Sequence, residues 1–120
     1  MIQPQELRLN NLVLYKDEVS IVKGVLQTSV DLLVNPCIRF TKLALLPNIH
    51  PIPLTEEWLI KLGLHEVLGV YAVYGIEITL KLVDGYWDVY FKGKYVTVIK
   101  HVHRLQNLFY SITGHELTLK

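Results

Sequence analysis

The chain has 120 residues, 51% of them hydrophobic and 19% charged, with a formal net charge of +1. This composition predicts one globular domain over residues 1–120 and excludes an intrinsically disordered chain. The near-neutral charge argues against a nucleic-acid partner.

The sequence also bears on location. No apolar run approaches the ~20 residues of a membrane span, and residues 1–11 lack the basic start and apolar core of a signal peptide. We therefore expect a cytoplasmic protein without membrane contact. The single cysteine, Cys37, excludes an intramolecular disulfide.

The first predicted element is a β-hairpin. Residues 12–16 and 19–25 are apolar enough for two strands around the polar turn Lys16-Asp17-Glu18. The first strand alternates poorly, so it is expected either to be buried on both faces or to belong to a small barrel. Gly24 predicts a bend or bulge in the second strand.

Residues 27–46 have the weakest pattern in the chain. The segments SVDLLV and CIRFTKLALL are apolar enough for strands, and Asn35-Pro36 predicts a break between them. Residues 47–53, PNIHPIP, follow as a stiff connector, because three prolines favour extended backbone.

A short helix is predicted at residues 56–62. Thr55 is a typical N-cap, Glu56 and Glu57 occupy the first turn, where the helix dipole favours negative charge, and Gly63 ends the helix. Adjacent helical residues point in different directions, so the two glutamates are not a catalytic pair. Residues 66–75 then predict one further strand, interrupted by Gly69.

Residues 76–99 predict a three-stranded antiparallel meander. Asp84-Gly85 is a strong signal for a two-residue hairpin turn, and Lys92-Gly93 supplies a second turn. Together the turns fix the register, in which one face is apolar and the other polar or aromatic. The expected apolar pairs are Leu82/Trp87, Leu80/Val89, Ile78/Phe91, Val89/Val96 and Trp87/Val98, and the expected pairs on the opposite face are Lys81/Asp88, Thr79/Tyr90 and Tyr90/Tyr95.

The apolar face of the meander requires a cover, and residues 102–113 predict the helix that supplies it. Gly114 is placed to end this helix, and residues 116–119 could add an edge strand. The predicted fold is therefore α+β: an antiparallel meander covered by a C-terminal helix, with an N-terminal hairpin and one short central helix. In the helix, the apolar positions are Val102, Leu105, Leu108, Phe109 and Ile112, and the residues expected mostly on the other side are His103, Arg104, Asn107 and Ser111.

Three blocks of the sequence, LRLNNLVLY, PIPLTEEWLIKLGL and HVHRLQNLFYSITGHELTLK, occur in this order along nearly the whole chain. In these blocks the chain resembles a family of short, uncharacterised proteins from Bacteroidetes and their phages and mobile elements. The resemblance implies a small accessory protein, carried by a phage. It implies no activity and no functional residue.

The main candidate site is the meander face opposite Trp87. Tyr86, Tyr90 and Tyr95 are expected there, and Lys81, Asp88 and Thr97 share that face. Such a surface could stack a nucleotide base, bury against a second subunit, or remain solvated with cross-strand tyrosine pairs. A secondary candidate lies around the last helix, at Arg104, Asn107 and Tyr110. The residues predicted to bind a ligand are Tyr86, Tyr90, Tyr95, Lys81 and Arg104.

Other motifs carry little chemistry. His101 and His103 form an H-x-H pair, but no Asp, Glu or Cys stands at a telling distance to complete a metal site. The glycines are isolated, so no phosphate-binding loop is predicted, and no nucleophile motif is present. We expect neither an enzyme nor a bound cofactor or metal.

The leading functional hypothesis is a non-enzymatic binding protein that is a homo-oligomer. In a phage context it would interfere with a host process by sequestering a small nucleotide-type signal, with tyrosines stacking the base and Lys or Arg meeting the phosphate. The alternative is a protein-interaction or structural module that acts through the tyrosine-rich face.

Overall fold

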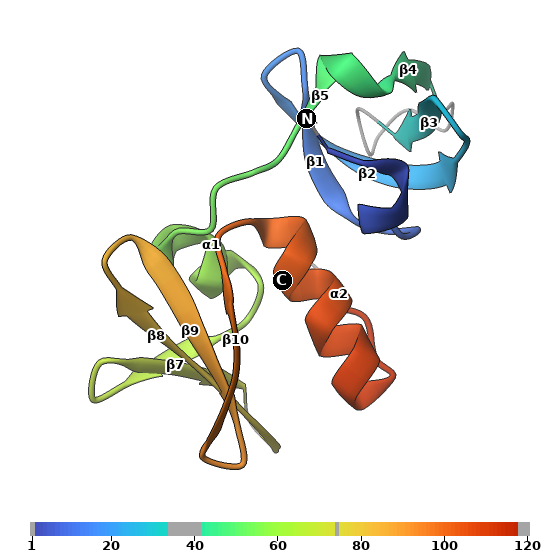
Figure 1. The fold of residues 1–120 in the computed structure, drawn as a ribbon. Helices are drawn as coiled ribbons and strands as arrows, with labels where there is room; N and C mark the ends of the chain where they lie inside the picture. The colour runs from blue at the N-terminus through green and yellow to red at the C-terminus, as the bar shows by residue number, and fades with distance from the viewer. Residues whose placement is uncertain (1, 34–41, 74, 118–120) are drawn as a thin grey trace.

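The computed structural model describes residues 2–33, 42–73 and 75–117. Within these residues the chain forms ten antiparallel strands in two five-stranded sheets, one short helix and one C-terminal helix that packs against the second sheet (Figure 1). The predicted α+β fold with its covering helix is confirmed. No helix of the described chain is long and apolar enough to cross a membrane.

The first sheet has the strand order β4-β3-β2-β1-β5, so the last strand returns to pair with the first. The predicted hairpin is confirmed, with a turn of only two residues, Lys16 and Asp17, which both have positive φ (50° and 62°). The elements of this half are η1 (Pro4–Glu6), β1 (Leu12–Tyr15), β2 (Glu18–Val25), β3 (Ser29–Leu33), β4 (Lys42–Leu45), η2 (Leu46–Asn48) and β5 (Ile49–His50).

β1 is buried on both faces, which is one of the two arrangements that its poor alternation predicted. Val13 and Tyr15 belong to the apolar core of the first sheet, whereas Leu12 belongs to the core of the second sheet. The bulge expected at Gly24 is also present, because the register of β2 against β3 shifts between Val22 and Gly24.

The predictions for residues 27–46 and 47–53 fare differently. Within residues 27–46, the strands β3 and β4 are present, and the break expected at Asn35-Pro36 lies outside the described residues. The connector of residues 47–53 is not extended throughout, because Leu46–Asn48 forms a 3-10 turn before β5. The φ of proline suits the first turn of a helix as well as extended backbone, so Pro47 is compatible with this turn.

The second sheet has the order β10-β9-β8-β7-β6. The segment predicted as one interrupted strand, residues 66–75, instead contributes a two-stranded hairpin, so one more strand is present than predicted. The turn is Leu68-Gly69, where both residues have positive φ (53° and 84°) and the chain reverses. The elements of this half are α1 (Glu56–Lys61), β6 (His65–Val67), β7 (Val70–Val73), β8 (Ile76–Val83), β9 (Tyr86–Phe91), β10 (Lys94–Ile99) and α2 (Val102–Thr113).

The predicted register is confirmed between β8 and β9 and partly wrong between β9 and β10. Every expected β8–β9 pair is present, and Tyr95 lies opposite Tyr90. A bulge between Tyr95 and Thr97 then shifts the register by one residue, so Val89 pairs with Thr97 and Trp87 pairs with Ile99. The shift buries Ile99, which is 7% exposed, and leaves Val98 44% exposed. Thr97 therefore lies on the Trp87 face, and not on the tyrosine face as predicted.

α1 has the predicted start and cap, and it ends one residue earlier than predicted, at Lys61. The Thr55 hydroxyl accepts a hydrogen bond from the Trp58 backbone N–H (3.3 Å), and Gly63 follows the helix with a positive φ of 92°. Leu59 and Leu62 are buried in the second core. The Trp87 indole N–H donates to the Leu54 carbonyl (2.8 Å), which ties α1 to the sheet.

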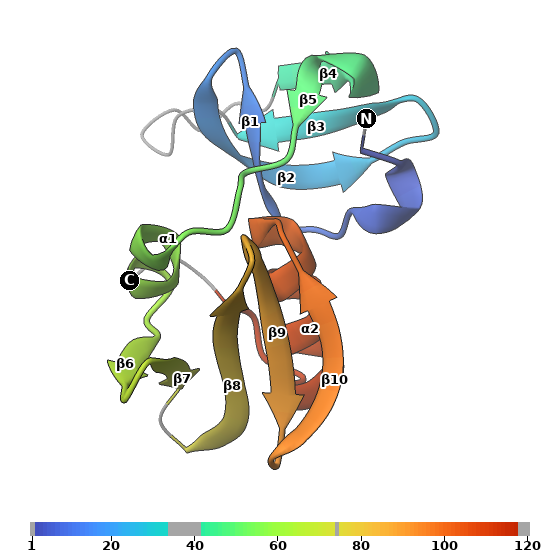
Figure 2. The same cartoon turned by 60° about the vertical axis from the view of Figure 1, so that its left-hand side comes forward.

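α2 has the predicted bounds, and its apolar side is buried as expected. Its polar side differs from the prediction, because His103 and Gln106 are each only 1% exposed. The reason is that α2 packs against both halves: its length lies along the second sheet, and its N-terminal part meets the first sheet (Figures 1 and 2). After α2, Glu116 and Leu117 are irregular, and the rest of the expected edge strand lies outside the described residues.

Candidate functional site

A groove of about 600 Å³ runs between β10 and α2. One wall consists of five consecutive residues, Thr97 to His101. Successive side chains of an extended chain point to opposite sides, so consecutive residues can line one groove only along the edge of the strand. β10 is the end strand of the second sheet. We call this cavity the β10–α2 groove.

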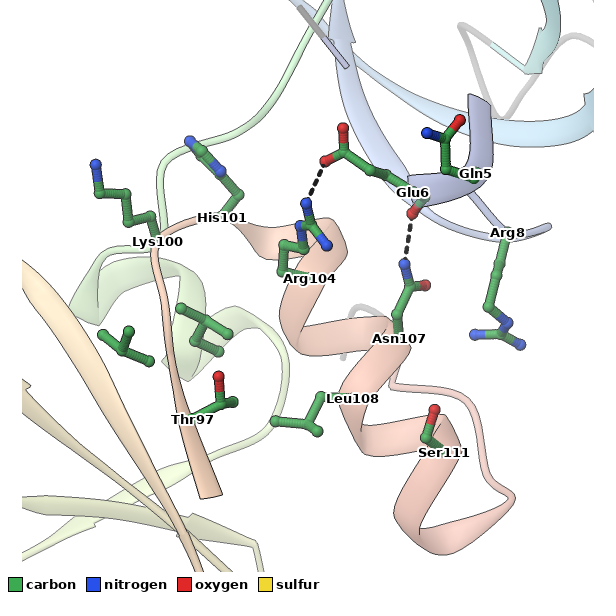
Figure 3. A pocket seen from close by; sticks show the side chains of 12 residues that line it. Gln5, Glu6, Arg8, Thr97, Lys100, His101, Arg104, Asn107, Leu108 and Ser111 are labelled. Carbon is green, nitrogen blue, oxygen red and sulfur yellow. Dashed lines mark hydrogen bonds and ion pairs between the residues drawn. The ribbon is translucent and has the colours of Figure 1, made fainter. Parts of the chain in front are cut away.

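The opposite wall is one stripe of α2. Arg104, Asn107, Leu108 and Ser111 lie at helical spacing and all line the groove. The end of the groove is closed by the N-terminal segment, through Gln5, Glu6 and Arg8 (Figure 3). The groove thus joins three segments that are far apart in the sequence.

Positive charge predominates in the groove. Arg8, Lys100 and Arg104 contribute three cations, and Glu6 is the single carboxylate among the lining residues. Arg104 pairs with Glu6 (2.8 Å), and its side chain is still 53% exposed. Lys100 Nζ lies 4.4 Å from the ring centroid of Tyr86. Lys100 and Arg104 therefore remain accessible to a ligand.

Glu6 holds the end of the groove in place. Its carboxylate accepts a hydrogen bond from the Gln3 backbone N–H (2.8 Å) and lies 3.4 Å from His103 Nε2, while its carbonyl accepts one from the Asn107 amide (2.6 Å) (Figure 3). Burial opposes its ionisation, but the hydrogen bonds from Gln3 and His103 and the charge of Arg104 lower the pKa of the Glu6 carboxyl. Glu6 is therefore ionised at neutral pH.

The two histidines of the H-x-H pair stack, with ring centroids 5.9 Å apart and planes 14° apart. Burial lowers the pKa of His101, and the nearby charges of Lys100 and Arg104 lower it further. Burial also lowers the pKa of His103, against the effect of Glu6. Both rings are neutral at pH 7. The described residues contain no group of three His, Cys, Asp or Glu side chains placed to hold a metal ion.

Gln106 fixes α2 to the N-terminal half. Its side-chain oxygen accepts from the Leu12 backbone N–H (2.8 Å), and its amide donates to the carbonyls of Asn10 (3.2 Å) and Leu117 (3.0 Å). The side chains of Asn11 and Asn107 are hydrogen-bonded to each other (2.8 Å). These contacts position the helix wall of the groove against its end wall.

Arg8 is held between two neighbours of the groove. Its guanidinium lies 3.8 Å from the ring centroid of Tyr110 and forms a 3.0 Å ion pair with Glu116. The ion pair with Glu116 neutralises part of its charge. Tyr110, which the sequence placed near a secondary site, therefore supports Arg8.

The tyrosine face is the outer face of the second sheet that carries Tyr86, Tyr90 and Tyr95. Tyr90 and Tyr95 pack edge to face, with centroids 5.9 Å apart, and Lys81 lies opposite Asp88. Tyr86 and Tyr95 are 41% and 56% exposed. The structure thus gathers four of the five predicted site residues on one face.

Arg104, the fifth predicted residue, is separate from the tyrosines and lies in the β10–α2 groove with Asn107. Lys100 connects the two surfaces, since it lines the groove and contacts Tyr86. The sequence did not indicate Glu6, Arg8 or Lys100 as site residues. No sequence motif links these three residues, because the groove forms only where the N-terminal segment packs on α2.

Comparison of the chain with protein-family models, curated proteins and solved structures finds no match. The chemistry of the groove therefore rests on its own geometry. Its guanidinium, ammonium, amide and hydroxyl groups are hydrogen-bond donors, and its carboxylate is already engaged with Arg104. Such a lining is suited to an anion.

Proposed function

We propose that the protein is a non-enzymatic binding protein that captures an anionic ligand in the β10–α2 groove. The observation that carries this proposal is the convergence of Arg8, Lys100 and Arg104 on one groove of about 600 Å³. That volume lies within the range of ~300–1,000 Å³ typical of ligand sites. Burial is the main cause of the lowered pKa of His101, and the charges of Lys100 and Arg104 lower it further, which agrees with a positive potential there.

A nucleotide-type small molecule is one ligand of this class. Its phosphate would lie between Lys100 and Arg104, and its base would stack on an arginine plane or on the Tyr86 ring. The resemblance to short phage proteins supports a role in which such a molecule, a host signal, is sequestered. For such a ligand, the proposed binding site is the β10–α2 groove and not the surface around Tyr90 and Tyr95 that the sequence predicted. Tyr86 lies at the margin of this groove.

Native mass spectrometry and calorimetry test the capture of an anion. Protein purified from cells is expected to release a small anionic mass on denaturation, or to bind inorganic pyrophosphate or a nucleoside diphosphate in titration. The double variant Lys100→Gln with Arg104→Gln should weaken binding at least tenfold, since two charge-assisted contacts are lost. Lys61→Gln, an exposed lysine on α1, is the matched control and should leave the affinity unchanged.

Two results would overturn the proposal. One is that the double variant binds every anion as tightly as the wild type. The other is that the wild type binds none of the anions offered, including an acidic peptide. If Lys81→Gln weakened binding more than the double variant does, the ligand would lie on the tyrosine face.

A second candidate function is protein interaction through the tyrosine face, including a homo-oligomer. It is favoured by the exposure of Tyr86, Tyr95 and Val98 on the outer face of one sheet, because exposed aromatic clusters often mark interfaces. Light scattering of the double variant Tyr90→Ala with Tyr95→Ala tests whether the tyrosine face is the interface of a homo-oligomer. A monomeric variant of an oligomeric wild type supports the interface, and an unchanged mass rejects it.

A further inference from the structure

The β10–α2 groove has the architecture of a site for an extended chain, because one wall is the edge of a strand and the other is a helix. We propose that its ligand is an extended acidic segment of another protein, which adds as a strand beside Thr97–Ile99. This inference rests on the proposed capture of an anion and names the class of the ligand.

The first step of the argument concerns the backbone. In an antiparallel pair, the N–H and C=O groups of every second residue bond to the neighbouring strand, and those of the residues between point to the other side. β10 pairs with β9 on one side. On its other side the Lys100 carbonyl already accepts a hydrogen bond from the Leu54 backbone N–H (2.7 Å), and by alternation the backbone groups of Val98, two residues earlier, also point outward and line the groove. An extended segment can satisfy both the N–H and the C=O of Val98, whereas a small anion without a donor can satisfy only the N–H.

The second step concerns how long the added strand can be. The bulge between Tyr95 and Thr97 interrupts the ladder of β10, which leaves Thr97, Val98 and Ile99 as the regular part of the edge. All three line the groove. The expected ladder is therefore short, and the side chains of the added segment must supply the rest of the affinity.

The third step concerns charge. Lys94 begins β10 and Lys100 follows it, so a lysine stands at each end of the edge. A second copy paired antiparallel about Thr97 would bring Lys94 of each chain near Lys100 of the other, and like charges oppose this. An acidic segment would instead meet Lys100 and Arg104 with opposite charge.

The helix wall fixes which side chains the segment needs. Arg104 lies beside His101 at one end of the groove, and Leu108 lies nearer Thr97 (Figure 3). Four residues of helix rise ~6 Å, and two residues of strand advance ~6.6 Å. Two side chains on one face of the added strand can therefore match Leu108 and Arg104. The pattern expected is an apolar residue and an acidic residue two positions apart.

The probe is the acetylated, amidated octapeptide Thr-Thr-Leu-Thr-Glu-Thr-Glu-Thr, titrated into the full-length ¹⁵N-labelled protein and followed by NMR. Saturable shifts are expected at the amides of Thr97, Val98 and Ile99. The peptide with Lys in place of both Glu should bind at least tenfold more weakly, and so should the acidic peptide to Arg104→Gln. Lys61→Gln is the control that should bind the acidic peptide as the wild type does.

Two N-methylated forms of the peptide test strand addition itself. One is methylated at the odd residues and the other at the even residues, so each blocks the donors on one edge of an extended chain. Strand addition predicts that one form loses binding at least tenfold and the other does not. If both forms bind like the parent peptide, the anion is captured without a new strand, which overturns this inference and leaves the proposed function intact.

The remaining outcomes are also decisive. If pyrophosphate or a nucleotide binds and no peptide does, the ligand is a small molecule, and this inference is wrong. If neither peptide nor small anion binds, the proposed function fails as well.

Discussion

At the scale of single residues, Gln106 carries an unusual share of the structure. It is buried, and its side chain makes three hydrogen bonds to backbone groups of residues 10, 12 and 117. A buried backbone group without a partner costs about 1–3 kcal/mol. One side chain thus supplies the hydrogen-bond partner for backbone groups from three separate segments.

Gln106→Met tests this role, because methionine has a similar shape and none of the hydrogen bonds. We expect the free energy of unfolding to fall by about 2–4 kcal/mol, since three buried backbone groups lose their partner. Urea denaturation measures it. Gln27→Met, at an exposed position, should change the free energy by less than about 0.5 kcal/mol. A similarly small loss for Gln106→Met would show that water replaces the side chain without cost.

His103 makes the stability depend on pH. Burial holds its pKa in the folded protein below the value of 6.5 of an ordinary histidine, so near pH 6.5 the unfolded chain binds more protons than the folded one. Its contribution is complete above pH 6.5 and is lost as the pH falls toward the lowered pKa. The free energy of unfolding, measured in urea between pH 8 and pH 5, should therefore decrease below pH 6.5.

His103→Gln is expected to flatten that decrease, because glutamine can still donate to Glu6 but does not titrate. His101, whose pKa is also lowered, keeps part of the slope in this variant. His115→Gln, at an exposed position, serves as the control. If the free energy of unfolding of His103→Gln depended on pH as strongly as that of the wild type, other groups would be responsible for the acid sensitivity.

At the scale of elements, the sequence predicted those whose geometry is local. Asp84-Gly85 and Lys92-Gly93 specify turns by their own conformational preferences, and both hairpins are present. The turn Leu68-Gly69 was missed because leucine rarely adopts a positive φ. Leu68 is 98% exposed, so the pairing of β6 with β7 on either side of the turn decides that conformation, and not the propensity of leucine.

The bulge in β10 has a cause that no local pattern contains. Either Val98 or Ile99 could lie beside Trp87, and alternation along the strand favours neither. Packing under α2 selects Ile99, which the bulge brings to the buried face. The sequence therefore predicted the strand but not the register of its second half.

Alanine substitutions check that register. Ile99→Ala should lower the free energy of unfolding by about 2–5 kcal/mol, as the loss of a buried isoleucine does. Val98→Ala should cost much less, since Val98 is 44% exposed. Urea denaturation of the two variants compares them directly. A larger loss of stability for Val98→Ala than for Ile99→Ala would instead support the regular register, without a bulge.

At the scale of the whole molecule, α2 is shared by two sheets. Its apolar side completes the second core, and Gln106 and Asn107 bond to the N-terminal segment. The candidate groove could not be predicted for the same reason. Arg104 was predicted as part of a secondary candidate site around the last helix, but Glu6 and Arg8 join it only through the packing of the N-terminal half on α2.

This sharing predicts that both sheets unfold together. Trp58 and Trp87 report on the second half by fluorescence, and amide signals of β1 to β3 report on the first half by NMR. Their urea midpoints should coincide in the wild type. In Gln106→Met the two midpoints should separate, because the main polar link is lost. Separate midpoints in the wild type would show two independent units.

The end wall of the groove has a consequence for the synthesis of the protein. Glu6 and His103 lie 97 positions apart, and at ~5–20 residues per second a ribosome needs roughly 5–20 s to add that length. The first sheet can fold during this interval, while the acceptors of Asn10 and Glu6 still face water. The groove exists only once α2 has been translated and has docked, so a truncated product is expected to bind no ligand.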